Sequence, residues 1–585
     1  MKEWNFKLIY PSHEAYLIEL EAIKKEIKEF AKLKGTLGSE AGQKNLAKLS
    51  RSVEEKLNRA FCYVSMKYDL NQKDVKASVD YQTVYQVYSE LISEIAFINP
   101  ELISVGVTKV LKLIDDLKLT ARRFEMVTLF RNQVHILDSK SEGIMANYNE
   151  TTGALYDLYD KLAVSDNNST KITISTGEEL NINESNFTYY LGVLPNQEDR
   201  RLVFETIYKF YENHKNTFAG IYNGIMLSEM ASVKHRGYDS ILESHLYSNA
   251  IPLEVYHSLI KTAKNNSDVL KKYYALRKKY FKLEKLHTYD RFLQFSHSEK
   301  EYSYELSKKM VLEACEALGK DYYEHAKRAL EDGRVSVETK DGKRTGAYST
   351  SLYQEGSFIL LNHNNNLDSA FTIAHEAGHS IHSLYSNENQ PFETANYRIF
   401  VAEIASTFNE QLFLDYVMKH SSSKEEKIVV LQQAIDNIVA TFYRQTLFAD
   451  YEFKAHELVE KKVPVTASAL SEIMVGLYKD YYGLDIKEEV YKHNVWAYIP
   501  HFFHSPFYVY QYATSFAASL AIYDKVKNNE SEALENYIKM LSMGGSTYPI
   551  DIVKTAGVDL TKPDAFIAVA KRFEELLEEL EELLK

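Results

Sequence analysis

The 585-residue sequence is poor in cysteine, proline and glycine. Its two cysteines, Cys62 and Cys315, lie far apart and outside any CxxC pattern, so neither a disulfide framework nor a cysteine-ligated zinc site is indicated. The 10 prolines and 22 glycines are fewer than is usual for this length, which leaves long stretches without helix breakers. We therefore expect a mainly α-helical protein in a reducing compartment, the cytoplasm.

Long apolar runs and an excess of positive charge are also missing. The N-terminal stretch "MKEWNFKLIYPSHEAYLIELE" has charges every few residues, unlike a signal peptide, and no later stretch approaches about 18 consecutive apolar residues. The formal net charge of −13 gives no overall field that favours nucleic acid or an anionic membrane. We expect neither partner, and the sequence does not indicate an oligomeric state.

Two regions follow from the patterning of apolar residues. Residues 1–185 are mostly amphipathic, with apolar positions three and four apart, and predict a helical N-terminal lobe. Near its end, "KITISTGEELNI" (171–182) alternates apolar and polar residues as a short hairpin does. Helical patterns resume in the second domain, residues 186–585.

One stretch of this second domain predicts a small β-sheet, near residues 333–362. It carries Asp341-Gly342, which we interpret as a hairpin turn, β-branched flanking residues and a second extended run at 358–361. An apolar helix is expected directly after it, near residues 369–386. The sheet should therefore lie beside that helix.

The helix contains an HExxH pattern formed by His375, Glu376 and His379. Histidines four residues apart project from one face of a helix and can share one metal ion, while Glu376 is turned aside and can reach a water molecule on that ion. This arrangement suits metal-assisted hydrolysis with Glu376 as the general base. Gly378 costs helix propensity, which indicates that another group approaches the backbone there.

A catalytic zinc ion needs a third protein ligand. His382 follows His379 by only three residues and is assigned to the helix face or to support of a ligand, whereas Glu388 and Glu393 lie in a polar connection and are expected to be solvated. Glu403 is the better candidate, because it lies within the apolar stretch "IFVAEIASTFNEQLF", where a carboxylate is costly unless it is paired or metal-bound. Glu410 follows on the same face and can hydrogen-bond a ligating histidine.

These motifs resemble a known family. "FTIAHEAGHSIHSLYS" followed by "QPFETANYRIFVAEIASTFNE" is similar to the oligoendopeptidase F branch of the thimet oligopeptidase-like zinc metallopeptidases. The similarity extends to "KHRGYDSILES", "GKRTGAYSTSLY" and "IPHFFHSPFYVYQYAT", and covers roughly residues 190–585.

The resemblance implies a large, helical, zincin-like peptidase with a clam-like body and a deep internal channel that admits short peptides. It implies one Zn²⁺ per chain, held by His375, His379 and Glu403, with Glu376 as the general base. The expected activity is hydrolysis of oligopeptides by a zinc-dependent endopeptidase.

The segment "IPHFFHSPFYVYQYATS" supplies further candidates. Peptide hydrolysis develops an oxyanion, which a phenol or imidazole donor can stabilise. If a helix begins after Pro506, Tyr508 and Tyr512 share a face and Tyr510 points away. Members of the family use a histidine and tyrosines of this region, so the resemblance assigns catalytic roles to His501, Tyr508 and Tyr512. Packing is the alternative for each tyrosine, since the chain contains 44.

Two further alternatives concern the whole protein. Glu-x-x-His also occurs at Glu254/His257 and Glu284/His287, and two such motifs are found in di-iron carboxylate oxidoreductases. The chain could instead be a non-catalytic helical binding protein with an accidental HExxH. The residues before the metal helix could offer a strand edge for a peptide backbone, or merely a hairpin that caps helices.

Overall fold

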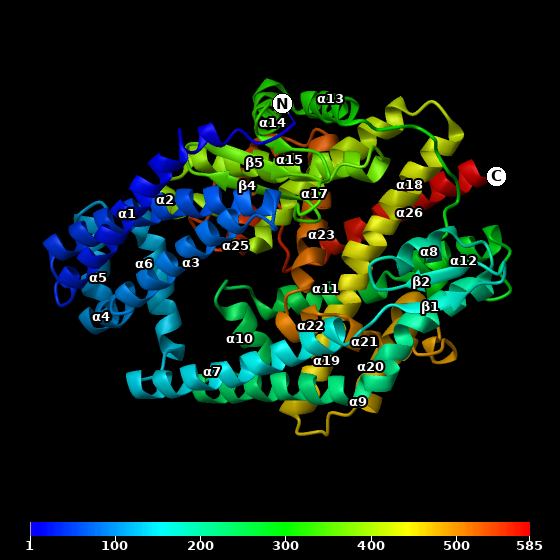
Figure 1. Ribbon diagram of the computed structural model, residues 1–585, viewed down its shortest axis with the longest axis horizontal. Helices are drawn as coiled ribbons and strands as arrows, with labels where there is room; N and C mark the ends of the chain where they lie inside the picture. Colours follow the sequence, from blue (N-terminus) through cyan, green and yellow to red (C-terminus); the bar gives the residue numbers. More distant parts are fainter. Residues whose placement is uncertain (1) are drawn as a thin grey trace. The chain divides into compact units, whose positions relative to one another are not determined.

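The computed structural model describes residues 2–585, which form two compact units (Figure 1). Each unit is assembled from separated stretches of sequence. The first comprises the chain up to Val134, Lys300–Lys419 and Ile522–Val558, and the second comprises His135–Glu299, His420–Ala521 and Asp559–Lys585. Helices dominate both units, so the prediction of a mainly α-helical fold is confirmed. The expected division between residues 185 and 186 stays a prediction.

The first unit contains one small sheet and many helices. Its strands are β3 (Val335–Ser336), β4 (Tyr348–Leu352) and β5 (Gly356–Leu360). Its helices are α1 (His13–Ile27), α2 (Glu40–Leu70), α3 (Val75–Ile95), α4 (Ile98–Val105), α5 (Val107–Asp116), α6 (Thr120–Asn132), α13 (Tyr304–Cys315), α14 (Lys320–Ala329), α15 (Leu367–Asn389), α16 (Phe392–Ala395), α17 (Ile399–His420), α24 (Ala533–Leu541) and α25 (Pro549–Thr555).

The second unit is also helical. Its strands are β1 (Thr170–Thr173) and β2 (Glu179–Ile182). Its helices are α7 (Ser139–Asp160), α8 (Phe187–Val193), α9 (Gln197–Arg236), α10 (Ile241–Tyr247), α11 (Leu253–Asn265), α12 (Asp268–Tyr280), α18 (Lys424–Ile438), α19 (Arg444–Glu460), α20 (Ala467–Tyr482), α21 (Val495–Tyr498), α22 (His501–His504) and α26 (Asp564–Leu584). Helix α23 (Tyr510–Lys527) begins in this unit and ends in the first.

The sheet of the first unit has the strand order β3-β5-β4. β3 is parallel to β5, and β4 is antiparallel to it, with Tyr348 opposite Leu360 and Thr350 opposite Phe358. The predicted sheet is present, but the interpretation of Asp341-Gly342 as its hairpin turn is wrong. The antiparallel strands β4 and β5 are joined by the turn after Leu352. The segment around Gly342 instead joins β3 to β4, which do not pair with each other, and it packs against Asn71.

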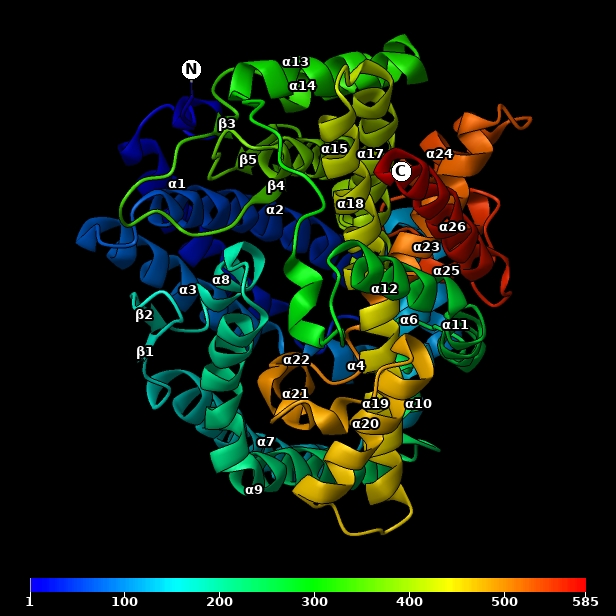
Figure 2. The same ribbon diagram turned by 90° about the vertical axis from the view of Figure 1, so that its right-hand side faces the viewer.

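Alternation along β4 and β5 divides the sheet into two faces. Phe358 and Leu360 are buried in the core formed with α1 and α2. Serines occupy the opposite face. The Ser349 hydroxyl lies 2.8 Å from Ser380 Oγ, and the Ser357 hydroxyl lies 3.3 Å from the Ser380 carbonyl oxygen. Helix α15 therefore lies directly on the sheet, as Figure 1 and Figure 2 show.

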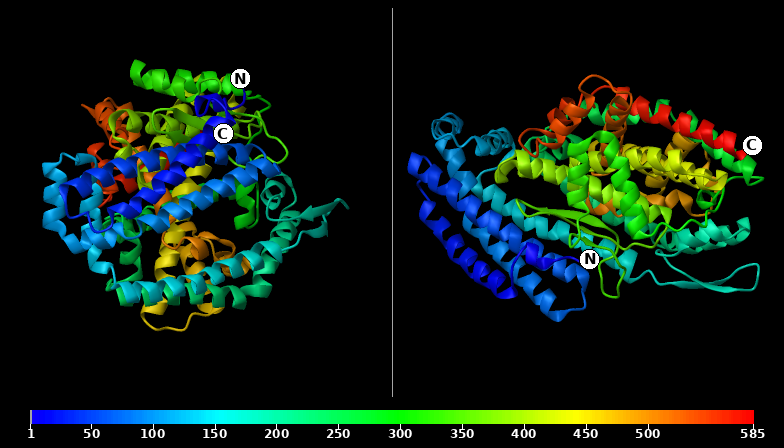
Figure 3. Two further views of the ribbon diagram at one scale, coloured as in Figure 1. Left: turned by 60° about the vertical axis from the view of Figure 1, so that its left-hand side comes forward. Right: turned by 90° about the horizontal axis from the view of Figure 1, so that it is seen from above.

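In the second unit, α7 and α9 lie side by side, and the β1–β2 hairpin packs next to α9 (Figure 3). The predicted hairpin at residues 171–182 is confirmed, with Thr170 opposite Ile182. The 40-residue α9 is capped by the Asn196 side chain and ends at Gly237, whose φ of 74° suits glycine.

Among the described residues, no single helix is long and apolar enough to cross a membrane, although the bent pair formed by residues 75–105 and 107–116 has a suitable length and composition.

Candidate metal centre

Helix α15 carries the HExxH residues and has well-defined ends. The Asn366 side chain caps its N-terminus by accepting a hydrogen bond of 2.8 Å from the Ser369 N–H. Its C-terminus lies just before Pro391, which cannot continue a helix with normal hydrogen bonding. The helix expected near residues 369–386 is therefore present and slightly longer.

Helices α15 and α17 pack backbone against backbone at Gly378. A Cβ atom at this position would lie 2.5 Å from the Ala405 carbonyl oxygen and 2.6 Å from Ser406 Cα. The close approach that Gly378 predicted is confirmed, and the partner is α17 (Figure 2). This contact brings the second ligand-bearing helix within side-chain reach of the HExxH face.

Three side chains converge between these helices. His375 Nε2 lies 3.2 Å from His379 Nε2 and 3.3 Å from Glu403 Oε2, and His379 Nε2 lies 3.5 Å from the same oxygen. A zinc ion bonded at about 2.0–2.1 Å in tetrahedral geometry separates its ligands by roughly 3.3 Å. Among the residues that the structure describes, this is the one group of three or more donors suited to a metal ion.

Two further contacts hold the triangle in place. His375 Nδ1 lies 2.5 Å from Glu410 Oε1, which confirms the contact predicted for Glu410. A carboxylate only accepts, so Nδ1 donates to Glu410, and Nε2 is the nitrogen that would bind a metal ion at the centre of the triangle. The Ser406 hydroxyl donates to Glu403 Oε2 at 3.0 Å and fixes that carboxylate.

The charges of the triangle favour cation binding. Burial opposes charge on His375, but hydrogen bonds to Glu403 and Glu410 outweigh it and raise its pKa well above the usual value. Burial likewise opposes charge on Glu403, yet hydrogen bonds from His375 and His379 lower its pKa far below the ordinary carboxyl range. The two carboxylates therefore draw positive charge between the helices, either as protons or as a metal ion.

Glu376 lies in a different electrostatic setting. Only 6% of it is exposed, and its Oε2 atom has no hydrogen-bond partner among the described residues. Burial raises the pKa of Glu376, while the neighbouring His375 and His379 lower it. A buried carboxylate oxygen without a partner beside a metal triad is ready to accept a proton.

His382 stays outside the ligand triangle, as predicted. It is fully buried, and its ring stacks on Tyr397 with centroids 3.6 Å apart. The Tyr397 hydroxyl lies 2.9 Å from Ser383 Oγ and 3.4 Å from the His379 carbonyl oxygen. Tyr397 was not identified from the sequence, because its contacts with α15 arise only when the chain folds back after Pro391.

The two carboxylates that were expected in a polar connection differ from each other. Glu388 belongs to the last turn of α15 and is exposed; it lies 3.0 Å from His325 Nε2 and forms an ion pair of 2.5 Å with Arg328. Glu393 is largely shielded, with 21% side-chain exposure and an Oε2 atom that lacks a hydrogen-bond partner in the described chain. The expectation of a solvated carboxylate is therefore wrong for Glu393, since α16 packs against α2 and α6.

The candidate oxyanion residues gather in the second unit. The rings of His501 and Tyr508 are 6.2 Å apart, those of His501 and Tyr512 are 6.0 Å apart, and the two tyrosine rings are 5.4 Å apart. Burial lowers the pKa of His501, and the neighbouring His504 lowers it further. The neutral imidazole and two phenols together provide hydrogen-bond donors on one half-buried surface.

The local structure that creates this surface differs from the expected helix. Helix α23 begins at Tyr510 rather than directly after Pro506, so Tyr508 lies in the preceding turn. Phe507 adopts a φ of 55°, and its N–H donates to Glu452 Oε1 at 2.9 Å. Tyr510 packs on Tyr256 with ring centroids 5.3 Å apart, away from the other two tyrosines as predicted.

The di-iron alternative does not fit the structure. Glu254 and His257 are exposed on α11, and Pro252 immediately precedes that helix. Glu284 is exposed and follows the end of α12 at Tyr280, so Glu284 and His287 lie outside a regular helix. Neither pair belongs to the group of metal-ligand donors found in the described chain.

Comparisons with known proteins agree with the geometry. The model of Peptidase family M3 matches residues 191–571. The chain is 34% identical to Oligopeptidase PepF of Bacillus subtilis, over 99% of this chain and 87% of that protein. It is 32% identical to an Oligoendopeptidase F homolog of Borreliella burgdorferi, over 100% and 98% of the two chains.

Solved structures show the same fold. The oligoendopeptidase-F of Enterococcus faecium superposes with a TM-score of 0.75 at 28% identity, covering 98% of each chain. A crystal structure from Chlamydophila abortus superposes with a TM-score of 0.90 at 30% identity, covering 100% of this chain and 98% of the other. The predicted resemblance is confirmed: the chain belongs to Peptidase family M3, within its oligoendopeptidase F branch, and is a metalloendopeptidase.

Proposed function

We propose that the protein is a zinc-dependent endopeptidase that hydrolyses short oligopeptides, with one Zn²⁺ per chain. The observation that carries this proposal is the convergence of two imidazoles and one carboxylate beside a buried carboxylate oxygen that has no partner among the described residues. The relatives named oligopeptidase or oligoendopeptidase F support the choice of peptides as substrates.

His375, His379 and Glu403 would hold the metal. Two nitrogens and one oxygen with separations of 3.2–3.5 Å fit a borderline-soft divalent ion such as zinc, and the set leaves a coordination position open. When bound, the metal supplies Lewis acidity that polarises a peptide carbonyl and makes water more acidic. Glu410 and Ser406 keep the donor atoms aimed inward.

Glu376 would move the protons of the reaction. Its Oε2 atom accepts a proton from the attacking water, and the carboxyl group then delivers that proton to the nitrogen of the leaving amine. The pKa raised by burial makes the carboxylate a stronger base than an exposed glutamate. The short HExxH spacing places this base one residue from the first ligand.

Donors from the His501 segment would stabilise the oxyanion. We assign this role to His501 and Tyr508, with Tyr512 as a further donor from the same surface. The support is their mutual packing and the neutral form that burial favours for His501 at physiological pH. A neutral imidazole and a phenol can donate hydrogen bonds without introducing a fixed charge.

Strand β4 would orient the peptide. In the described part of the chain it pairs with β5 alone and forms one edge of the sheet, while its serine face touches α15. An extended peptide can add to such an edge through backbone hydrogen bonds, which require little sequence specificity. The two buried, unpaired cysteines favour a reducing compartment, and we propose the cytoplasm.

The test is mass spectrometry of a digest of mixed peptides with graded lengths. We expect internal cleavage of short peptides, its loss after treatment with a chelator, and its return when zinc is added. Intact peptides in the presence of fully metallated protein would contradict the proposed function.

A further inference from the structure

A hollow of about 540 Å³ opens on the first unit between helices α2, α3 and the short α16. Its walls are mainly apolar and include Phe61, Tyr88, Ile92 and Phe392. Two carboxylates, Glu54 from α2 and Glu393 from α16, belong to the same lining. The hollow therefore combines an aromatic and aliphatic wall with negative charge.

The α3 wall is unusually exposed for its composition. Tyr85, Tyr88 and Ile92 have 56%, 48% and 49% of their surface accessible, although each is a large apolar or aromatic residue. They recur at three- and four-residue spacing and form one stripe of the helix. A contiguous exposed stripe that lines a hollow indicates a binding surface more than a solvated helix face.

The charges around the hollow are unevenly paired. Arg122 donates to Glu125 at 3.3 Å, and Arg51 lies 3.8 Å from Glu393. No residue of the described chain forms an ion pair or hydrogen bond with the Glu54 carboxylate at these distances. Desolvation by its surroundings, together with the charge of Glu125, raises the pKa of Glu54 to about 7, although Arg122 lowers it. A cation that enters the hollow would relieve the repulsion between the Glu54 and Glu125 carboxylates.

The α16 wall is fixed in position by contacts of the segment that follows α15. The Thr394 carbonyl accepts a hydrogen bond of 2.7 Å from the Gly545 N–H, and the Ala395 carbonyl accepts one from Ser386 of α15. Two residues further along, Tyr397 stacks on His382, which lies one turn beyond the ligand His379. The hollow is thus built on the segment that links the two ligand-bearing helices.

We propose that this hollow binds a lysine or arginine side chain of the peptide substrate. The alkyl stem packs on the Tyr88, Ile92 and Phe392 wall, and the charged end reaches Glu54 and Glu393. The tyrosine rings add cation–π attraction. This inference rests on the proposed peptidase function and names a preference within its substrate class.

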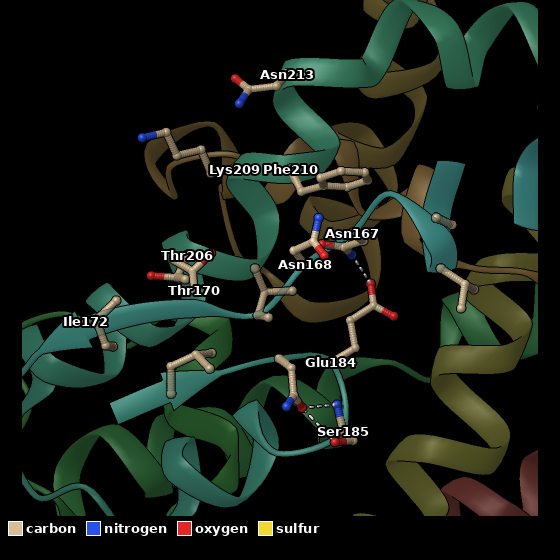
Figure 4. A pocket seen from close by; sticks show the side chains of 15 residues that line it. Asn167, Asn168, Thr170, Ile172, Glu184, Ser185, Thr206, Lys209, Phe210 and Asn213 are labelled. Atoms are coloured by element: carbon tan, nitrogen blue, oxygen red, sulfur yellow. Dashed lines mark hydrogen bonds between the residues drawn. The ribbon is translucent and has the colours of Figure 1, made fainter. Parts of the chain in front are cut away.

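Chemistry separates this occupant from others. A neutral apolar side chain would cover the wall but offer no hydrogen-bond donor to the Glu54 carboxylate, and a peptide α-ammonium group lacks the stem that the wall requires. A second hollow, on the other unit, has different chemistry (Figure 4). There the Glu184 carboxylate already accepts hydrogen bonds from Asn167, at 2.9 Å, and from Tyr211, and Lys209 also lines the hollow.

The experiment measures binding to the full-length, zinc-loaded Glu376→Gln variant, which should retain peptides without cleaving them. The probes are fluorescent peptides of one length, acetylated at the N-terminus and amidated at the C-terminus, in which a single lysine is moved along a neutral background. Matched peptides carry norleucine at the same position. We expect one register in which the lysine peptide binds about tenfold more tightly than its norleucine partner.

Three variants in the same background decide the assignment. Glu54→Gln should reduce the lysine preference to about twofold or less, and Tyr88→Ala should weaken the lysine and norleucine peptides alike. Glu90→Gln makes the same charge change on α3 outside the hollow, and Asn168→Ala alters the other hollow; neither should change the preference. An unchanged preference in Glu54→Gln, or an equal loss in Glu90→Gln, would overturn the proposal.

Two more results distinguish a failure of the proposed peptidase function from a failure of the proposed side-chain binding site. If lysine peptides bind as expected but the parent enzyme with zinc cleaves no peptide, the proposed function fails while the binding site stands. If free-amine peptides bind tightly and acetylation abolishes binding regardless of lysine, the cation is the α-ammonium group and the side-chain assignment is wrong.

Discussion

The ligand triangle and the His501 surface show two ways of assembling chemical groups. In the triangle, His375 and His379 are aligned by one regular turn of α15, and Glu403 is added by a second regular helix that packs at Gly378. On the His501 surface, Tyr508 reaches its neighbours through an irregular turn before α23. Helical periodicity therefore encodes the first arrangement, and tertiary contacts determine the second.

This difference predicts unequal sensitivity to substitution. Residues on regular helices should each have one separable role, whereas residues held by a turn share their positions with the contacts that shape that turn. Substitutions in the triangle should alter metal retention or proton transfer selectively. Substitutions near Tyr508 should change kcat selectively only when they leave the turn itself intact.

The largest effect is expected from Glu376→Gln, which separates proton transfer from metal binding. Removal of the general base should lower kcat by about 10³-fold, because the amide cannot accept the proton from water. Zinc content measured by elemental analysis should stay at the level of the parent protein. Glu388→Gln, an exposed change on the same helix, serves as the control and should leave kcat unaltered. Loss of zinc from Glu376→Gln would mean that its role is misassigned.

Glu403→Ala should break the triangle. We expect zinc affinity, measured by competition with a chelating dye, to fall by more than about 100-fold, since two imidazoles remain without the carboxylate. Glu410→Gln should lower the affinity less, by about 10–100-fold, because it removes only the support for the His375 tautomer. Parental affinity in Glu403→Ala would show that another residue is the third ligand.

Tyr508→Phe examines the second region. Loss of one oxyanion donor should lower kcat by about 10²-fold with little change in KM, a pattern typical of an interaction made only in the transition state. Tyr510→Phe is the matched control, since its ring packs on Tyr256 and should not contact substrate. Equal kcat values for Tyr508→Phe and the parent enzyme would refute the oxyanion role.

The smallest effect concerns stability near the triangle and depends on pH. Burial lowers the pKa of His382 to about 3, from 6.5 for an exposed ring. The folded state therefore favours the neutral imidazole of His382. The contribution of this preference to the free energy of unfolding is complete above about pH 6.5 and is lost as the pH falls toward 3. Near pH 5 the loss should be about 2 kcal/mol.

His382→Phe should remove that pH dependence while keeping a ring against Tyr397. The comparison is the difference in unfolding free energy, from urea denaturation, between about pH 7.5 and about pH 5. His257→Gln, at an exposed position on α11, should retain the parental difference. The same acid sensitivity in His382→Phe and the parent would assign it to other groups.

Much of the ligand triangle can be predicted from the sequence, for a physical reason. A helix fixes the relative directions of His375 and His379, and a carboxylate within an apolar helix needs a partner, which singles out Glu403. The role of Gly378 also follows from its low helix propensity. The stacking of Tyr397 on His382 does not follow, because it depends on the path of the chain between two helices.

The errors have a common origin in short-range interpretation. Asp341-Gly342 is a favourable turn sequence, but the strands of this sheet pair across a different connection. Pro506 can begin a helix, yet Phe507 adopts a left-handed conformation that delays the helix to Tyr510. The solvated environment expected for Glu393 is wrong for the same reason, since neighbours distant in sequence shield its side chain.

Gly378 has no functional group, yet the hydrogen atom in place of its side chain sets the spacing of two helices. Any larger substituent would move the carboxylate donor away from both imidazoles without altering a single ligand. Damaging variants of this enzyme should therefore include some with every donor atom present, and a survey restricted to those donors would overlook them.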